Sequence, residues 1–503
     1  MKAGQGKWAS VALAWALCVS VPPVAIAKDK PAAAQPAGIP LAKPITAKER
    51  QQGAAAHTGI VEEFGGPYAS PAQSAYVERV GRKSATQSGL SADPAAFDVT
   101  LLNSPINNAF AIPGGYIYVT RQLVALMNDE AELAAVLGHE VGHVAARHSQ
   151  KRQTAATRNS ILGVLGQVLV GAALGGDSQI GQLLNKGIGT GAQLATLGYS
   201  RTQESEADSL GIQYLVRAGY DPMAMSTVLQ SLAAQTSLDG RIAGNAQTLP
   251  AWASTHPDPE LRYRRAAQLA AQSGVTNGVR NRDAFLTAID GIMYGDDPKA
   301  GVIEGSRFLF PTGRLTFTIP AGYSMQNGAK AVLVTGTNAQ ATFASAPYDG
   351  NLDTYVTAVF RGLVTGGTTV PQFVINRTTI NGIPVASGRI TGTSGQSQVD
   401  VTVVAYAPST TQAYHFLMLT PVGQGLGPMD AMVRSFRTMT PTEAAAVKPR
   451  YLRVVKVGKV DTLQSLSARM AFTDFQMDRF LVLNGFTTAT KLVVGQKVKV
   501  VTY

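Results

Sequence analysis

Apolar residues recur at helical spacing between residues 129 and 148. The apolar positions of this stretch are Leu133, Val136, Leu137, Val141 and Val144. They share one face of a helix, because residues three and four apart are neighbours on a helical surface. Asp129, followed three residues later by Glu132, resembles a capping box at a helix start. The pattern therefore predicts a helix over residues 129–148 with one buried face.

Shorter patterns surround this helix. Residues 97–101 and 116–120 alternate as strands do, and Pro113-Gly114-Gly115 between them indicates a turn. Helical spacing returns after residue 208 and continues to about residue 272. We therefore expect residues 57–275 to form a mainly helical domain with a small sheet.

From residue 308 onward the pattern changes to strands, with alternation in residues 315–320, 331–334, 398–406 and 414–419. Residues 354–363 and 428–436 are typical of helices. Residues 308–442 are thus expected to form an antiparallel α+β domain, which loosely resembles the PsbP-like fold, after a connector at 276–307. Its expected role is docking or scaffold, and His415 is expected to be a sheet residue.

The first residues have the pattern of an export signal. Lys2 and Lys7 precede an apolar run over residues 8–21, and Ala25-Ile26-Ala27 is typical of a cleavage site. The pattern predicts a cleavable signal peptide at residues 1–27 that exports the chain to the periplasm. It predicts no transmembrane span in the mature chain. Residues 28–56, rich in Ala, Pro and Lys, are expected to be a flexible lead-in.

Composition narrows the classes of function. The 503 residues are 45% apolar, which is enough for several cores and about three domains. The net charge is +11, but the basic residues are scattered and an exported protein does not meet nucleic acid. Cys18, inside the predicted signal, is the one cysteine, which excludes disulfides and a thiol nucleophile in the mature chain.

The sequence His139-Glu140-Val141-Gly142-His143 lies within the predicted helix. Residues four apart share one helical face, so both imidazoles can reach one metal ion at about 2 Å. Glu140 lies off that line, where it can act on an activated water as general base. This pattern is typical of a zinc peptidase. The alternative is an amphipathic helix with two surface histidines.

A catalytic zinc site needs a third protein ligand and an open position. Glu204 is the candidate, at the start of the next predicted helix. Glu204 and Asp208 would share a face, so that Asp208 could hold a ligand imidazole by its free ring nitrogen. The spacing alone leaves open that these acids form an ordinary solvated helix face.

Five stretches together resemble metallopeptidase family 48, the HtpX and CAAX prenyl protease type, and most closely its soluble periplasmic branch. They are residues 63–68, 107–117, 132–140, 200–208 and 254–257. The resemblance implies a zincin-type core that holds one Zn²⁺ through His139, His143 and Glu204. It leaves Glu206 outside the ligand set.

The resemblance also implies a substrate-binding role for Asn107, Asn108, Ala109 and Phe110. They would belong to a small sheet above the zinc, whose edge pairs with an extended substrate and recognises mainly its backbone. The alternative is that Asn107 and Asn108 are only turn residues.

His256 lies in Ser254-Thr255-His256-Pro257-Asp258-Pro259, where two prolines favour an extended loop. The resemblance implies that this loop is near the site, and we treat His256 as a candidate catalytic residue. It would either take the open zinc position as a latch or stabilise the oxyanion. The alternative is a histidine that caps the helix beginning near Glu260.

Residues 161–197 are rich in Gly, Ala and Leu. They are expected to form helices with glycine hinges near the cleft. This stretch would be either a lid or a plain helical hairpin of the core.

The last residues, 450–503, resemble a LysM module, a β-α-α-β glycan binder with its own boundaries. The matching stretches are residues 454–458, 461–466, 483–485 and 492–498. Val460 departs from the family, which usually has Gly there. The alternative is a packing unit on the preceding domain.

We therefore expect a secreted zinc endopeptidase of the cell envelope that cleaves misfolded or unassembled envelope proteins. Candidate partners are protein substrates, peptidoglycan through residues 450–503, and outer-membrane assembly proteins, with attachment to the wall or outer membrane. The alternatives are a largely inactive, chaperone-like assembly factor and a peptidoglycan hydrolase.

Overall fold

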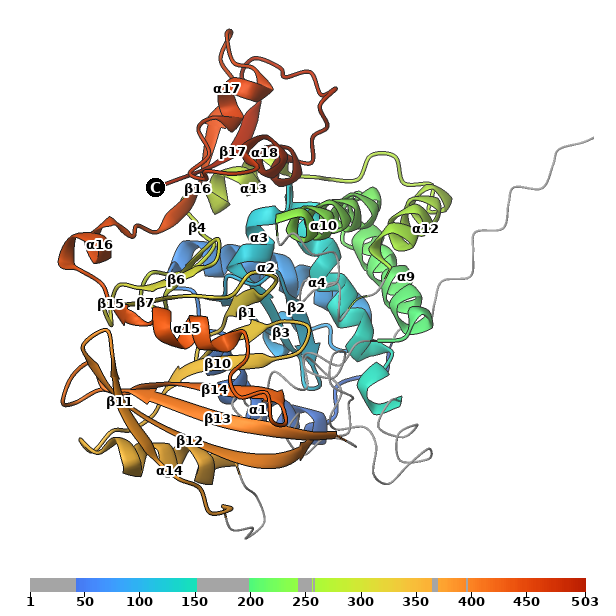
Figure 1. Cartoon of the computed structure of the whole chain (residues 1–503). Coiled ribbons are helices and arrows are strands. Elements are labelled where there is room, and N and C mark those ends of the chain that lie inside the picture. The colour runs from blue at the N-terminus through green and yellow to red at the C-terminus, as the bar shows by residue number, and fades with distance from the viewer. Residues whose placement is uncertain (1–41, 152–198, 243–255, 257, 364–369, 395–396) are drawn as a thin grey trace, which may run out of the picture. The chain divides into compact units, whose positions relative to one another are not determined.

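The computed structural model describes residues 42–151, 199–242, 256, 258–363, 370–394 and 397–503 (Figure 1). The expected signal peptide at residues 1–27 and the glycine-rich stretch at 161–197 lie outside these ranges. The described chain mixes helices and sheets, as the α+β expectation requires.

The first sheet has three strands in the order β1 (Asp98–Leu102), β3 (Tyr116–Thr120) and β2 (Ala109–Ile112). β1 and β3 are parallel, and β2 pairs with β3 in antiparallel register. β1 and β3 confirm the two strands predicted from alternation. β2 is an edge strand among the described strands, although all four of its side chains are buried.

The helices around this sheet are α1 (Ala47–Glu63), α2 (Pro71–Ala85), α3 (Arg121–Leu126), α4 (Glu130–Ala145), α9 (Arg201–Arg217), α10 (Met223–Ile242), α12 (Pro259–Gln272) and α13 (Arg282–Ile289), with 3₁₀ turns η1 (Thr86–Ser88) and η2 (Pro94–Ala96). α2, α4, α9 and α10 contribute to one hydrophobic core with β1 and β3.

α4 is the predicted helix of residues 129–148. Asp129 caps it, because its Oδ1 accepts a hydrogen bond of 2.9 Å from the backbone N–H of Glu132. The helix ends at Ala145, earlier than predicted. The reason is Arg147, whose φ of 51° turns the chain out of the right-handed helix.

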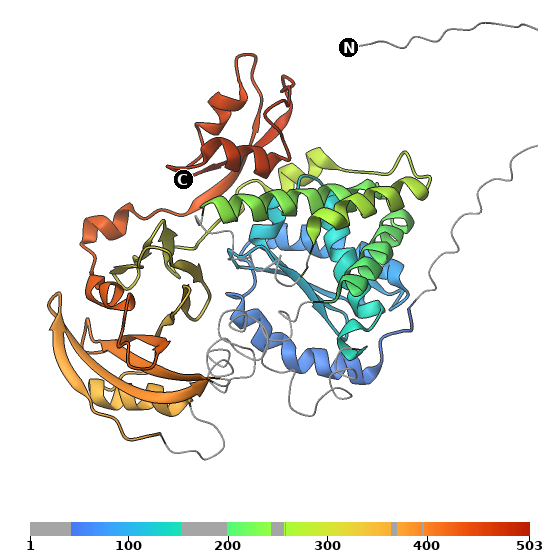
Figure 2. The ribbon, with the colours of Figure 1, turned by 45° about the vertical axis from the view of Figure 1, so that its right-hand side comes forward.

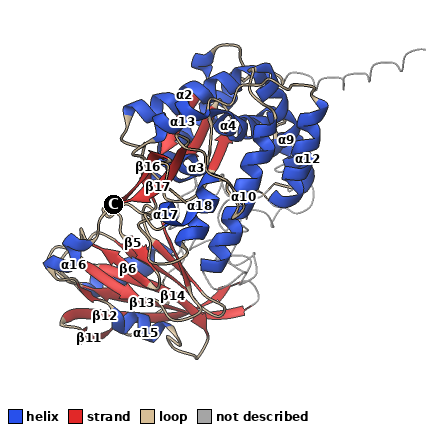
Figure 3. Cartoon of the chain, turned by 90° about the horizontal axis from the view of Figure 1, so that it is seen from above, coloured by secondary structure: helices blue, strands red, loops and turns tan. Residues whose placement is uncertain are grey.

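α4 and α9 lie side by side (Figures 1 and 3) because small residues line their contact. A Cβ atom added at Gly142 would lie 3.1 Å from the carbonyl oxygen of Ala207, and one at Gly211 would lie 3.1 Å from the backbone nitrogen of His139. The backbones therefore approach closely. This approach brings side chains of α9 to the histidines of α4.

The flexible lead-in expected at residues 28–56 is wrong for its last part, because helix α1 begins at Ala47. Thr46 and Glu49 form a complete capping box, a local signal that composition alone does not reveal. The helix packs through Gly53, where a Cβ would lie 2.4 Å from the carbonyl oxygen of Pro113.

Strands dominate residues 302–438 (Figure 3). A seven-stranded antiparallel sheet has the order β11 (Asn376–Ile380), β12 (Ile383–Ser394), β13 (Ser397–Tyr406), β14 (Tyr414–Pro421), β10 (Gln340–Ser345), β9 (Val332–Thr335) and β8 (Ser324–Asn327). A second sheet has the order β15 (Arg437–Thr438), β7 (Leu315–Thr318), β6 (Arg307–Phe310) and β5 (Val302–Glu304).

Two helices accompany these sheets. α14 (Leu352–Leu363) lies along β12 and β13 (Figures 1 and 2), and α15 (Met429–Ser435) packs on β7. Both helices and the four strands expected between residues 315 and 419 are confirmed. The short helix α16 (Pro441–Ala446) was not predicted, nor were the strands β5, β6, β8, β10, β11, β12 and β15.

Residues 450–502 fold as β16 (Arg450–Lys456), α17 (Leu463–Ser467), α18 (Gln476–Asn484) and β17 (Lys497–Thr502). This is the β-α-α-β order that was expected, and its identification as LysM-like stays a prediction. The unit is not separate from the helices around the first sheet, because Phe480 and Val500 belong to the same hydrophobic core as Leu126 and Leu137.

Residues 276–307, which were expected to be only a connector, also form part of the folded core. They contain α13, and β4 (Met293–Tyr294) pairs with β16. Phe285, Leu286 and Ile289 of α13 are buried in the shared core.

Where the structure describes the chain, no helix combines the length and the apolar character that crossing a membrane requires.

Candidate metal centre

α4 carries the two histidines of the predicted ligand pair. His139 and His143 are both buried, and their Nε2 atoms lie 3.0 Å apart. Two nitrogen ligands at about 2.0–2.1 Å from one tetrahedral ion lie roughly 3.3 Å apart. The pair is therefore spaced for one shared metal ion.

α9 brings Glu204 to the same point. Its carboxylate oxygens lie 3.4 Å from the Nε2 atom of His143 and 3.6 Å from that of His139. Arg262 of α12 also contacts it, with Nη1 2.6 Å from Oε2. Burial alone would raise the pKa of Glu204, but His256 and Arg262 beside it hold that pKa well below its usual range. Glu204 is thus an ionised carboxylate.

His256 joins the cluster from the loop before α12. Its Nδ1 atom lies 3.0 Å from Oε2 of Glu204, and its Nε2 atom lies 3.7 Å from Oε1 of Glu140. His139, His143, Glu204 and His256 each offer one ligand atom, and these four atoms lie within 4.8 Å of one another. Imidazole nitrogen and carboxylate oxygen are the donors that zinc prefers. The buried cluster can hold one metal ion, consistent with Zn²⁺.

Asp208, one turn further along α9, lies behind His139. Its Oδ1 atom is 2.9 Å from Nδ1 of His139, so that Nε2 of the same ring faces the cluster. Arg262 donates to both oxygens of Asp208, at 2.7 and 2.8 Å. Burial opposes ionisation, but Arg262 and His139 lower the pKa of Asp208 well below its usual range. Asp208 therefore links His139 to Arg262.

Glu140 is buried beside the cluster without joining it. Its Oε1 atom has no hydrogen-bond partner among the described residues. Burial raises the pKa of Glu140 well above its usual range, and the nearby Glu204 carboxylate adds to this rise. A carboxylate with this proton affinity is suited to accept a proton.

Sequence reasoning missed three residues of this centre. His148 is fully buried, and its Nδ1 atom lies 2.8 Å from Nδ1 of His143. Glu206 lies 3.1 Å from Nε2 of His148. Tyr199 stacks on His143, with ring centroids 3.6 Å apart. A straight helix to residue 148 would place His148 on the opposite side, and nothing in the sequence marks the turn at Arg147.

Residues 71–270 match the sequence profile of peptidase family M48. These residues are an M48 peptidase domain. A β-barrel assembly-enhancing protease of Yersinia pestis is 33% identical over 231 residues, 45% of this chain and 45% of that protein. The mitochondrial metalloendopeptidase OMA1 of Arabidopsis thaliana is 33% identical over 198 residues, 39% of this chain and 36% of that protein. The chain matches less than half the length of these relatives.

The family is one of metallopeptidases, which agrees with the buried donor set of the M48 domain. A crystal structure from Bacteroides thetaiotaomicron aligns with a TM-score of 0.24 at 9% identity, over 40% of this chain and 87% of that chain. That likeness is too weak to inform the fold.

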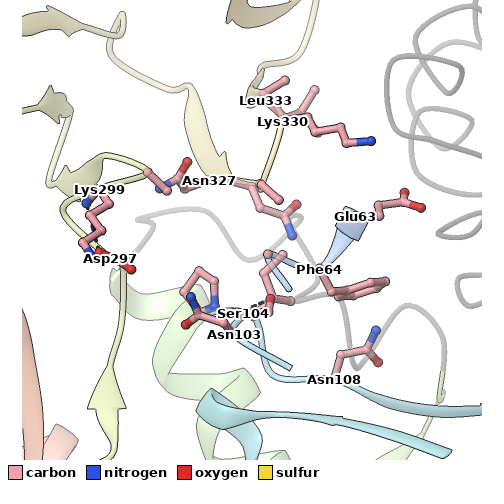
Figure 4. A pocket seen from close by; sticks show the side chains of 18 of the residues that line it. Glu63, Phe64, Asn103, Ser104, Asn108, Asp297, Lys299, Asn327, Lys330 and Leu333 are labelled. Carbon is pink, nitrogen blue, oxygen red and sulfur yellow. Dashed lines mark hydrogen bonds between the residues drawn. The ribbon is translucent and has the colours of Figure 1, made fainter. Parts of the chain in front are cut away.

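The predicted substrate-binding residues lie at the start of the edge strand β2 of the M48 domain. Ala109 and Phe110 are buried as whole residues, with 1% and 5% of their surface exposed. Asn108 lines a cavity of about 380 Å³, together with Phe64 (Figure 4). Asn327 of β8 and Leu333 of β9 line the same cavity.

Proposed function

We propose that the protein is a zinc-dependent endopeptidase of the cell envelope. The observation that carries this proposal is the buried set of His139, His143 and Glu204 beside an uncoordinated Glu140, inside an M48 domain. This set supplies three ligands and a general base, which is the minimum for metal-assisted peptide hydrolysis.

In the proposed reaction, His139, His143 and Glu204 would hold a zinc ion, and Asp208 and Arg262 would orient these ligands. A bound zinc ion supplies Lewis acidity toward the scissile carbonyl and the attacking water. Glu140 takes a proton from that water and later delivers it to the leaving amine. The polypeptide forms no covalent bond with its substrate.

His256 has two proposed roles, both supported by its position between Glu204 and Glu140. As a latch it fills the fourth place of the ligand cluster until substrate arrives. As an oxyanion donor it offers an N–H group to the carbonyl oxygen on which negative charge develops.

Substrate is proposed to bind in extended form along the edge of β2, through backbone hydrogen bonds near residues 107–110. The cavity of Figure 4 lies at the start of this strand, and its apolar wall would accept a substrate side chain. Backbone recognition suits misfolded or unassembled proteins. The Yersinia pestis relative is named for β-barrel assembly, which supports a substrate among envelope proteins under assembly.

The periplasm is the proposed compartment, following the export pattern of residues 1–27. Residues 308–442 are proposed as a docking domain for assembly partners. Residues 450–503 are proposed to bind peptidoglycan, for which the β-α-α-β order gives support.

One experiment separates the proposal from its alternatives. The purified protein and its Glu140→Gln variant would each be given an unfolded outer-membrane protein and, separately, muropeptides. We expect zinc-dependent cleavage of the protein by the parent and about 100- to 10,000-fold less by Glu140→Gln, because an amide cannot accept the proton.

Other outcomes identify other functions. Cleavage of muropeptides alone would make the protein a wall hydrolase. Suppressed aggregation without cleavage by either form would make it a chaperone-like factor. Equal cleavage by parent and variant would remove Glu140 from the mechanism.

A further inference from the structure

We propose that His148 and Glu206 are positioning residues, which together orient His143 toward the metal ion. This inference rests on the proposed function, since it concerns how the protein holds its metal. Neither residue reaches the ligand cluster itself. Their effect would pass through the ring of His143.

The hydrogen-bond pattern allows one arrangement of protons. A metal-binding Nε2 atom of His143 must be free of hydrogen, so that its Nδ1 atom carries the N–H. That N–H donates to Nδ1 of His148 at 2.8 Å. His148 then carries its own hydrogen on Nε2 and donates it to Glu206 at 3.1 Å. The chain from Glu206 through His148 thus selects the tautomer of His143 that can bind metal.

The two ligand histidines are supported from the same helix in two different ways. Asp208 of α9 contacts His139 directly. Glu206 of α9 reaches His143 only through the intervening ring of His148. Each imidazole therefore has an acidic residue behind it, which is the usual arrangement for a metal-binding histidine.

The backbone around His148 is built to keep this ring in place. Arg147, just before it, has a left-handed φ of 51°, a conformation that costs a non-glycine residue free energy. Glu49 of α1 holds the Arg147 side chain at 3.2 Å, and Arg147 also donates to the carbonyl of Pro44. Gln203 donates to the carbonyl of His148 at 3.4 Å.

These contacts fix a turn that would otherwise be unfavourable, and the turn folds His148 back under His143. If His148 served only to end the helix, it would need neither its full burial nor the left-handed backbone of Arg147 before it. The fully buried ring of His148 is therefore explained by its contact with His143.

The test is the zinc affinity of the full chain, measured by competition with a chromophoric chelator. His148→Phe keeps the ring's bulk and removes the acceptor for His143. Glu206→Ala removes the acceptor for His148, and Glu206→Gln keeps a side-chain oxygen that can accept the same hydrogen bond. We expect about 10- to 100-fold weaker zinc binding for His148→Phe and Glu206→Ala, and recovery of most of this loss in Glu206→Gln.

A second readout separates positioning from loss of structure. The visible spectrum of the cobalt(II)-substituted protein reports the geometry of the ligands. It should change in His148→Phe, while the unfolding temperature of the metal-free protein stays near that of the parent. Because the side chain of Glu206 is 43% exposed, Glu206→Ala should fold even if His148→Phe does not.

Glu78→Ala is the matched control, because Glu78 is also an ion-paired helical glutamate with a 37% exposed side chain, on α2. It should leave zinc affinity unchanged. Parental affinity and an unaltered cobalt spectrum in both His148→Phe and Glu206→Ala would overturn the inference. A parent protein that binds no zinc would instead contradict the proposed function.

Discussion

At the scale of single residues, burial decides which charges the molecule keeps. Glu204 and Asp208 are buried beside Arg262, which stabilises both as carboxylates. Glu140 has no such partner among the described residues at hydrogen-bond distance, and burial raises its pKa. α4 and α9 therefore carry two kinds of carboxylate. Glu204 and Asp208 are suited to contact a metal ion or its ligands, and Glu140 is suited to accept a proton.

His256→Ala tests the role of the fourth cluster member. Since a ring nitrogen of His256 already lies among the other ligand atoms, we expect a latch and a several-fold rise in basal proteolysis. Turnover and zinc content would be measured together. A fall of about a hundredfold with zinc retained would assign an oxyanion role instead, and unchanged turnover would contradict both.

We expect His415, on β14 of the seven-stranded sheet, to make the protein less stable in acid. Burial lowers its pKa to about 4, and its Nδ1 atom lies 3.0 Å from the Tyr355 hydroxyl. The unfolded chain binds this proton near pH 6.5, so that unfolding takes up a proton between pH 6.5 and 4. The free energy of unfolding should therefore fall as the pH drops through this window, by roughly 3 kcal/mol in all.

The measurement is denaturant unfolding at several pH values. His415→Phe keeps a buried ring and cannot titrate, so its stability should change less between pH 6.5 and 4. An identical pH dependence in parent and variant would show that other groups are responsible.

At the scale of elements, packing between helices explains what sequence patterns could and could not predict. The spacing of His139, Glu140 and His143 was enough to place one half of the centre, because a single helix fixes their geometry. Glu204 reaches the histidines only because α4 and α9 approach closely. Glycines permit this approach, but the spacing of residues along the sequence does not show that the two helices meet. His148 depended on a left-handed turn stabilised by α1, a long-range contact outside any local pattern.

A buried ammonium group links two other elements. Lys499 of β17 is fully buried, and its Nζ donates to the carbonyls of Ala125, Leu126 and Met127 at 2.9, 3.0 and 2.6 Å. Three carbonyls at the C-terminal end of α3 thus find their donor in the last strand. Lys499→Met should destabilise the protein by about 3 kcal/mol, because it leaves these acceptors unpaired.

Denaturant unfolding checks this value. Lys497→Met is the control on the same strand, since Lys497 bonds Thr287 at a partly exposed site and should cost less than about 1 kcal/mol. Equal stability of parent and Lys499→Met would show that the buried ammonium contributes nothing.

At the scale of the whole molecule, the boundaries of the units were the least predictable feature. Alternation indicated strands such as β9, in which buried and partly exposed residues alternate. β14, by contrast, is buried on both faces. The short strand β4 gave no such signal, because its pairing partner β16 lies about 150 residues away in sequence. The C-terminal unit shares its hydrophobic core with helices of the M48 domain, a contact that the sequence did not indicate.

The zinc content of the purified protein, compared with that of Glu204→Ala, tests the central claim most directly. Metal analysis after dialysis should find one zinc per chain in the parent and much less in Glu204→Ala, because the variant loses the one carboxylate of the ligand cluster. A parent without zinc, or a Glu204→Ala variant that retains a full equivalent, would contradict the metal centre described above.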